Sequence, residues 1–192
     1  MKETLIIIVF IIVFYIVFII SDSSLVKIEV NGNIVLVRDT PDKEQSAKLL
    51  SELINRMYAL KQYVVDNKNK YPDYIEYINQ FNENFTKSRT KIYETSLTSE
   101  YTSYSINKGE ELVFCLRSKS SFKLHDINLL AYVAVHELAH TACPDTGHTP
   151  LFNKIFKFLL ERAMEIHVYY YEDYANHPIE YCGMKLYTNI LN

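Results

Sequence analysis

The stretch VAVHELAHTACPDTGHTPLF, residues 133–152, holds three histidines and a glutamate among residues that are mostly apolar or small. His136 and His140 are four residues apart, so on a helix both imidazoles project from one face toward a common point. Two imidazoles at this spacing can hold one metal ion, and zinc is the expected species. The sequence therefore predicts a zinc site on a helix.

A third ligand must come from another segment, because a helix does not turn fast enough to supply it. Pro144 disfavours a longer helix, and Gly147 allows the positive φ that could bring the chain back. His148 follows at this return, so we expect it to be the third ligand, with Asp145 as the alternative. Three ligands leave a fourth position of zinc open.

Glu137 lies next to the first of these histidines. Its carboxylate could take a proton from water at the open position and deliver that proton to a leaving amine. This is the machinery of amide hydrolysis, and Glu137 is the candidate catalytic base. A purely structural zinc site needs ligands but no such carboxylate.

Two helices must position these residues. Asp126 is a plausible N-cap for INLLAYVAVHELAH, which is apolar nearly all round and is therefore expected to be buried. Thr149 and Pro150 are typical of the cap and first residue of a second helix, which carries an apolar stripe from Phe152 to Ala163. His148 then lies on a short turn between two helix ends.

The remaining elements are expected around this pair. Asn31-Gly32 between alternating segments predicts a hairpin, and a helix is expected from Pro41 to about Val65, with Thr40 as its cap. A short helix is expected around residues 73–81, followed by a less ordered connection to residue 100. A second hairpin turns at residues 107–109, and its second strand, ELVFCLRS, could form the edge along which an extended peptide lies.

The amino-terminal segment Leu5 to Ile20 is an uncharged apolar run. As a helix it would be about 24 Å long, close to the thickness of a hydrocarbon core. The sequence predicts an uncleaved transmembrane anchor over residues 1–23 and a single-pass membrane protein with its domain over residues 24–192. A cleaved signal peptide is the alternative. Charges near the run do not decide the side of the membrane.

Composition restricts the other function classes. The net charge is −3 and basic residues are scattered, so no nucleic-acid surface is indicated. Cys115, Cys143 and Cys182 are an odd number at wide spacing, which favours buried free thiols over a disulfide framework or a cysteine zinc site. Tyr181, in IEYCGMKL, could hydrogen-bond an oxyanion.

The segments INKGEELVFCLRS, HDINLLAYVAVHELAH and GHTPLF resemble the WLM and SprT-like group of zinc metallopeptidases. The match covers roughly residues 100–165. The resemblance implies an α+β zincin-like (mini-zincin) fold with a small antiparallel sheet and an active-site helix. It also implies His136, His140 and His148 as zinc ligands and Glu137 as the catalytic base. The whole chain, with VRDTPDK and YCGM, is also similar to WLM-like proteins of large DNA viruses.

Two features depart from the group. Seven residues separate His140 from His148, more than WLM sequences usually have. A membrane anchor also does not suit the repair of proteins crosslinked to DNA, so that substrate is not carried over. The sequence predicts a membrane-anchored zinc metallopeptidase acting on a protein or peptide, in a host or virion membrane if the chain is viral. The alternative is a non-catalytic, membrane-anchored, zinc-stabilised structural or virion and envelope protein.

Overall fold

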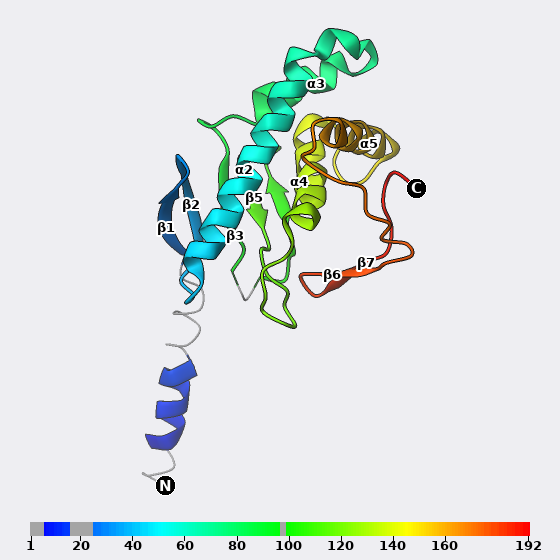
Figure 1. Ribbon diagram of the computed structural model, residues 1–192. Helices are drawn as coiled ribbons and strands as arrows, with labels where there is room; N and C mark the ends of the chain where they lie inside the picture. Colours follow the sequence, from blue (N-terminus) through cyan, green and yellow to red (C-terminus); the bar gives the residue numbers. More distant parts are fainter. Residues whose placement is uncertain (1–5, 16–24, 97–98) are drawn as a thin grey trace.

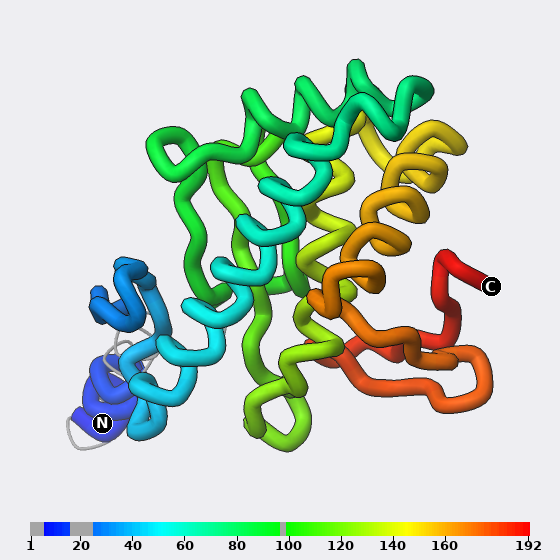
Figure 2. Tube along the Cα trace, turned by 45° about the horizontal axis from the view of Figure 1, so that its top comes forward, coloured from blue at the N-terminus to red at the C-terminus, as the bar shows by residue number. Residues whose placement is uncertain are grey.

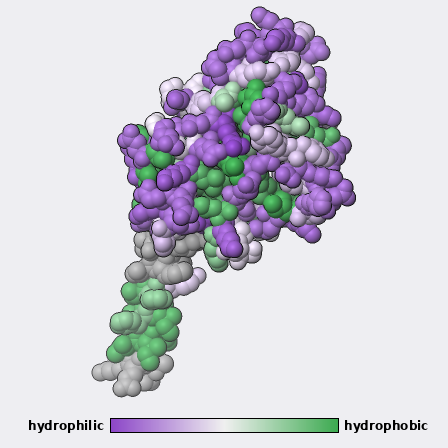
Figure 3. All heavy atoms as spheres, in the orientation of Figure 1, coloured by the Kyte–Doolittle hydropathy of each residue, from purple (hydrophilic) through white to green (hydrophobic). Residues whose placement is uncertain are grey.

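The computed structural model describes residues 6–15, 25–96 and 99–192 of the chain. Residues 6–15 form a helix whose exposed apolar side chains give the hydrophobic surface at the foot of the molecule in Figure 3. Among the described residues, no helix is both long and apolar enough to cross a membrane. The rest of the expected anchor, residues 1–5 and 16–23, lies outside the described residues, so the anchor stays a prediction.

The domain is built on a five-stranded sheet with the order β1-β2-β3-β5-β4. Its strands are β1 (Leu25–Val30), β2 (Asn33–Arg38), β3 (Lys91–Glu94), β4 (Tyr104–Ile106) and β5 (Glu111–Phe114). The outer pairs are antiparallel, but β3 runs parallel to both β2 and β5. The expected antiparallel sheet is therefore wrong. Because the chain passes through helices between β2 and β3, it can return in the same direction, as parallel pairing requires.

Both predicted hairpins are confirmed. Asn31 and Gly32 have φ values of 51° and 74°, and this left-handed pair joins β1 to β2 in the tight turn that the dipeptide favours. Residues 107–110 join β4 to β5. In the second hairpin the first strand, β4, lies at the edge of the sheet and the second strand, β5, lies inside it. The sequence predicts the second strand at the edge.

Four long helices pack with this sheet: α2 (Lys43–Asp66), α3 (Ile75–Asn84), α4 (Ile127–Ala142) and α5 (Pro150–Glu165). Two short 3-10 turns, η1 (Lys68–Lys70) and η2 (Pro72–Tyr74), lead into α3. The helix expected from Pro41 begins two residues later than predicted, after Asp42. Thr40 makes no cap because the helix begins three residues after it; its hydroxyl instead donates to the Asp42 carboxylate at 2.9 Å and accepts from Arg117.

Figures 1 and 2 show α2 lying along the sheet, α4 beside it and α5 on the far side of α4 from β1 and β2. Helix α4 is therefore enclosed, as its nearly continuous apolar sequence predicts. Its buried residues include positions on every side of the helix: Leu129, Leu130, Ala131, Val133, Ala134, Val135, Leu138 and Ala139. A polar side chain on this helix has little access to water unless a cavity reaches it.

A buried ionic cluster holds one end of the sheet. Glu94 at the end of β3 is fully buried, and its carboxylate lies 3.4 Å from Nε of Arg38 and 3.3 Å from Nε of Arg117. Arg117 also pairs with Asp42 at the start of α2. Burial raises the pKa of Glu94, while the two guanidinium groups oppose that shift. The cluster joins β2, β3, the segment after β5 and α2.

A separate two-stranded hairpin, β6 (Ile179–Tyr181) and β7 (Met184–Leu186), follows the helices. Its turn residue Cys182 forms a disulfide with Cys115, just after β5, with the two Cα atoms 6.2 Å apart. The expectation of free thiols is therefore wrong for this pair and confirmed for Cys143, which is free and buried. A sequence separation of 67 residues gives no local signal for such a bond.

Candidate metal centre

Helix α4 places two of the three candidate ligands. Asp126 caps its start by accepting a hydrogen bond from the backbone N–H of Asn128 at 2.7 Å, which confirms the predicted N-cap. His136 and His140 lie one turn apart, with ring centroids separated by 5.0 Å. Both rings therefore face the same point beside the last turn of the helix.

His148 reaches that point from the segment between α4 and α5. Gly147, with φ of 79°, makes the return, and Thr149 caps α5 by accepting from the N–H of Phe152 at 3.2 Å. The Nε2 atom of His148 lies 2.9 Å from Nε2 of His136. Among the described residues, potential ligand atoms of His136, His140 and His148 form a cluster within 4.8 Å of one another.

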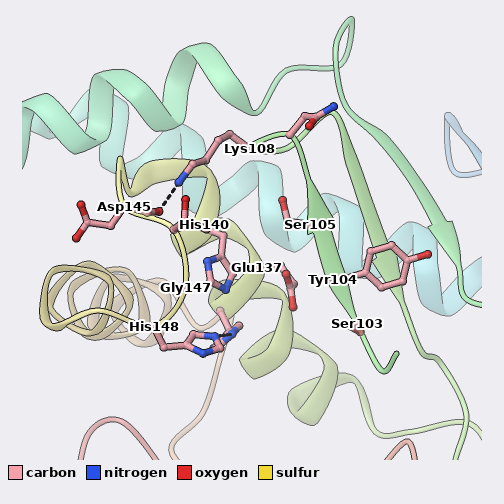
Figure 4. Close-up of a pocket in the computed structure, with 12 residues that line it drawn as sticks. Ser103, Tyr104, Ser105, Lys108, Glu137, His140, Asp145, Gly147 and His148 are labelled. Carbon is pink, nitrogen blue, oxygen red and sulfur yellow. Dashed lines mark hydrogen bonds between the residues drawn. The ribbon is translucent and has the colours of Figure 1, made fainter. Parts of the chain in front are cut away.

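Asp145 does not join this cluster. Its carboxylate accepts a hydrogen bond from the hydroxyl of Thr149 at 2.7 Å, and in Figure 4 it points away from the histidine rings. The backbone turn that brings His148 inward thus turns the Asp145 side chain outward. Of the two alternatives for a third ligand, the geometry favours His148.

The three imidazoles have the properties that a zinc site requires. Two nitrogen ligands on tetrahedral zinc lie about 3.3 Å apart, given Zn–N distances of about 2.0 to 2.1 Å, and the observed nitrogen separations are compatible with that spacing. Burial lowers the pKa of His136 to about 3 and the pKa of His140 to about 4. Both rings are therefore neutral near pH 7, which is the form that binds metal.

Phe152, in the first turn of α5, packs against all three histidine rings. Its ring centroid lies 4.2 Å from that of His140 in a stacked arrangement, and 5.0 and 4.9 Å from those of His136 and His148. The sequence indicates Phe152 as part of an apolar stripe and of the segment GHTPLF, with no contact to the histidines expected. The spacing of four residues between His148 and Phe152 is the sequence signal for this contact. Through Phe152, the first turn of α5 covers one side of the histidine cluster.

Glu137 lies on the other side of the cluster. It is only 5% exposed, and burial raises the pKa of its carboxyl group to about 8. In the described part of the chain it has no hydrogen-bond partner. Figure 4 shows Glu137 between the histidines and the segment that carries Ser103 and Ser105. The residue is thus positioned to act on a molecule that enters from that side.

An open cavity of about 570 Å³ gives such a molecule access. One wall is residues 103–108, which include edge strand β4, and the other is the segment Asp145 to His148. His136, Glu137 and His140 also line the cavity. The edge that faces the site is therefore β4 and not ELVFCLRS, the strand expected from sequence to bind an extended peptide. That expectation is wrong because β5 pairs on both sides, with β3 and β4.

Tyr181 does not line the cavity. It is buried, its hydroxyl contacts that of Ser103, and its ring lies 5.0 Å from the ring of His125. Burial raises the pKa of Tyr181, so its hydroxyl stays protonated. The structure places Tyr181 behind Ser103, and a direct contact with an oxyanion stays an untested prediction.

No protein-family model matches the chain. Among solved structures, it is similar to a mutant of Wss1 from Saccharomyces cerevisiae, with a TM-score of 0.52 and 18% identity, over 69% of this chain and 90% of that one. A second Wss1 structure gives a TM-score of 0.50 at 19% identity. At this identity the likeness shows the fold alone.

Sequence relatives occur in viruses. The chain is 28% identical over 145 residues to uncharacterized protein 136R of Invertebrate iridescent virus 6, covering 72% of this chain and 76% of the relative. It is 41% identical over 171 residues to uncharacterized protein R325 of Acanthamoeba polyphaga mimivirus, covering 89% of this chain and 86% of the relative. The chain therefore belongs to the family of viral proteins that includes R325.

Proposed function

We propose that this chain is a zinc-dependent peptidase with His136, His140 and His148 as the metal ligands. One observation carries the proposal: three imidazoles converge beside a buried carboxylate, that of Glu137, at the wall of an open cavity. A site that only stabilises a fold needs neither that carboxylate nor that access. The arrangement therefore favours catalysis over the structural alternative.

The fold and the sequence motif support the same proposal. The chain has a fold like that of Wss1, and its motifs resemble the WLM group of zinc metallopeptidases. Fold likeness alone does not establish an activity. The arrangement of the three histidines and Glu137 at the cavity supports the activity.

The chemistry divides between the metal and the chain. When bound, zinc would lower the pKa of water toward about 7 and polarise a scissile carbonyl. Glu137 would accept the proton of the attacking water and deliver it to the leaving amine. In the metal-free chain burial raises the pKa of this carboxyl group to about 8, and the positive charge of bound zinc would lower that pKa, which favours the carboxylate form that accepts a proton.

Strand β4 would orient the substrate. It is the last strand of the sheet and its outer edge is free among the described strands. An extended peptide could add to this edge by main-chain hydrogen bonds, which would place a peptide bond between β4 and Glu137. Ser103 and Ser105 line the cavity there, so the adjacent substrate positions would meet small polar side chains.

Metal-dependent cleavage tests the proposal. Full-length protein in detergent should cleave casein, a cell-derived protein mixture or itself when loaded with zinc. A chelator should abolish this activity and added zinc should restore it. His136→Ala should lose both zinc and activity, because it removes a ligand, whereas His177→Ala changes an exposed histidine outside the cluster and should keep both. A wild type that binds zinc but cleaves none of these substrates would favour the structural alternative.

A further inference from the structure

His148 differs from the other candidate ligands because no helix carries it. It lies in the segment 143–149, which has neither helix nor strand. A ligating histidine usually donates its second ring N–H to a partner that fixes the ring. In the described part of the chain, the contact with His136 is the only side-chain hydrogen bond of His148. The position of this ring therefore depends on how the backbone of the segment is held.

Lys108 holds that backbone from across the cavity. Its ammonium group donates to the carbonyl of Cys143 at 2.7 Å and also to the carbonyl of Asp145 (Figure 4). Both carbonyls lie between the last turn of α4 and His148. Carbonyl groups at a helix C-terminus lack partners within the helix and attract a cation. With Thr149 bound to the Asp145 carboxylate, the segment is held on two sides.

The turn between β4 and β5 fixes Lys108 itself. Asn107 and Lys108 have φ values of 47° and 54°, a conformation that is uncommon for residues other than glycine. Gly109 follows with φ of 101°, and a Cβ atom there would lie 2.9 Å from the Thr141 side chain of α4. Arg89 donates to the carbonyl of Asn107 at 3.0 Å. The turn is thus packed on α4 and directs the Lys108 side chain toward the segment.

We propose that Lys108 is a positioning residue for the metal centre, because its ammonium group holds the Cys143 and Asp145 carbonyls so that His148 meets His136 and His140. This inference rests on the proposed zinc site. Seven residues separate His140 from His148, so the segment between them needs an additional contact to hold His148 in place. Lys108, from the β4–β5 turn, provides that contact. The same lysine lines the cavity, so it also limits the space that a substrate can occupy.

Zinc affinity in a double-mutant cycle tests the inference. Lys108→Met should weaken zinc binding about 10-fold to 100-fold, the usual effect of losing a group that orients a ligand. Lys108→Arg retains a cationic donor and should restore most of the affinity. In a His148→Ala background, Lys108→Met should change the affinity less than about twofold, because the segment no longer carries a ligand. Competition with a chromophoric chelator measures each constant in the full chain.

Lys61 provides a matched control. Its ammonium group donates to the carbonyls of Asn82 at 3.0 Å and Phe85 at 2.6 Å, near the end of α3, and does not contact the segment 143–149. Lys61→Met should therefore lower thermal stability without changing zinc affinity. If Lys61→Met and Lys108→Met weaken zinc binding equally, Lys108 acts only through general stability and the inference is wrong.

The absorption spectrum of Co²⁺-loaded protein gives a second readout that does not need a measurable affinity in every variant. The Lys108→Met spectrum should move toward that of His148→Ala, since both changes remove His148 from the metal. A wild-type spectrum in Lys108→Met would overturn the inference and leave the proposed function intact. A wild type that binds no metal would instead refute the proposed function itself.

Discussion

At the residue scale, the principal feature is an acidic side chain buried next to neutral imidazoles. Glu137 lies on a helix that is otherwise enclosed by apolar packing, and burial raises its pKa to about 8. The ligand spacing and this carboxylate could be predicted from sequence because both depend on helix periodicity. The contacts of Phe152 and Lys108 could not, because they depend on how separate elements pack.

The raised pKa of Glu137 predicts that the free energy of unfolding of the metal-free protein depends on pH. Its folded pKa of about 8 exceeds the ordinary value of 4.5, so between these values the folded state binds the proton more tightly than the unfolded state. The free energy of unfolding therefore falls as pH rises through this window. Glu137→Gln removes the titration and should be the more stable protein at about pH 8, by the order of a few kcal/mol.

Denaturant unfolding in the presence of a chelator measures this difference. At about pH 3.5, below the unfolded pKa of 4.5, the advantage of Glu137→Gln should shrink toward zero, because the carboxyl group is then protonated in both states. The histidines titrate alike in both proteins, so their contributions cancel in the comparison. Parallel stability curves from about pH 5 to pH 8 would show that Glu137 is not buried as described.

At the scale of elements, long apolar patterns predict the helices and short patterns do not identify the short strands. The apolar periods of α2, α4 and α5 and the turn signals of two hairpins are confirmed. Strand β3 has only four residues, KIYE, so its pattern is too short to distinguish from a connection. The β6–β7 hairpin has strands of three residues each, which are also too short to predict. Its disulfide could not be predicted because the two cysteines are 67 residues apart in sequence.

The disulfide should contribute measurably to stability. Cys182→Ser frees the β6–β7 hairpin from the end of β5 and should lower the free energy of unfolding by about 2 to 4 kcal/mol. A Cys115→Ser/Cys182→Ser double variant should lose a similar amount, because either change breaks the same bond. A reductant should destabilise the wild type but neither variant. If the reductant leaves wild-type unfolding unchanged, the two thiols are not paired in solution.

At the scale of the whole molecule, the site lies between parts of the chain that only the tertiary fold brings together. The crossover from β2 to β3 makes the sheet mixed, and β4 then becomes the edge beside α4. The sequence identified the correct hairpin but placed the wrong strand at the edge, because strand order depends on β3. The anchor belongs to this scale as well and stays a prediction from the sequence.

The anchor hypothesis predicts that the full-length protein stays with membranes during carbonate extraction and keeps its original amino terminus. The physical reason is the apolar run from Leu5 to Ile20, which would lie in the hydrocarbon core. A variant that lacks residues 1–23 should be extracted. A mature amino terminus near Ser24, or release of the intact chain by carbonate, would show a processed or peripheral protein instead.

The rate of peptide-bond cleavage by Glu137→Gln, compared with the wild type at equal zinc content, tests the central claim most directly. The substitution keeps the size of the side chain and leaves all three imidazoles in place, but it removes the group that accepts the proton of water. We expect close to one zinc ion per chain in both proteins and a cleavage rate about 10²-fold to 10⁴-fold lower in the variant. Equal rates in the two zinc-loaded proteins would contradict the proposed mechanism.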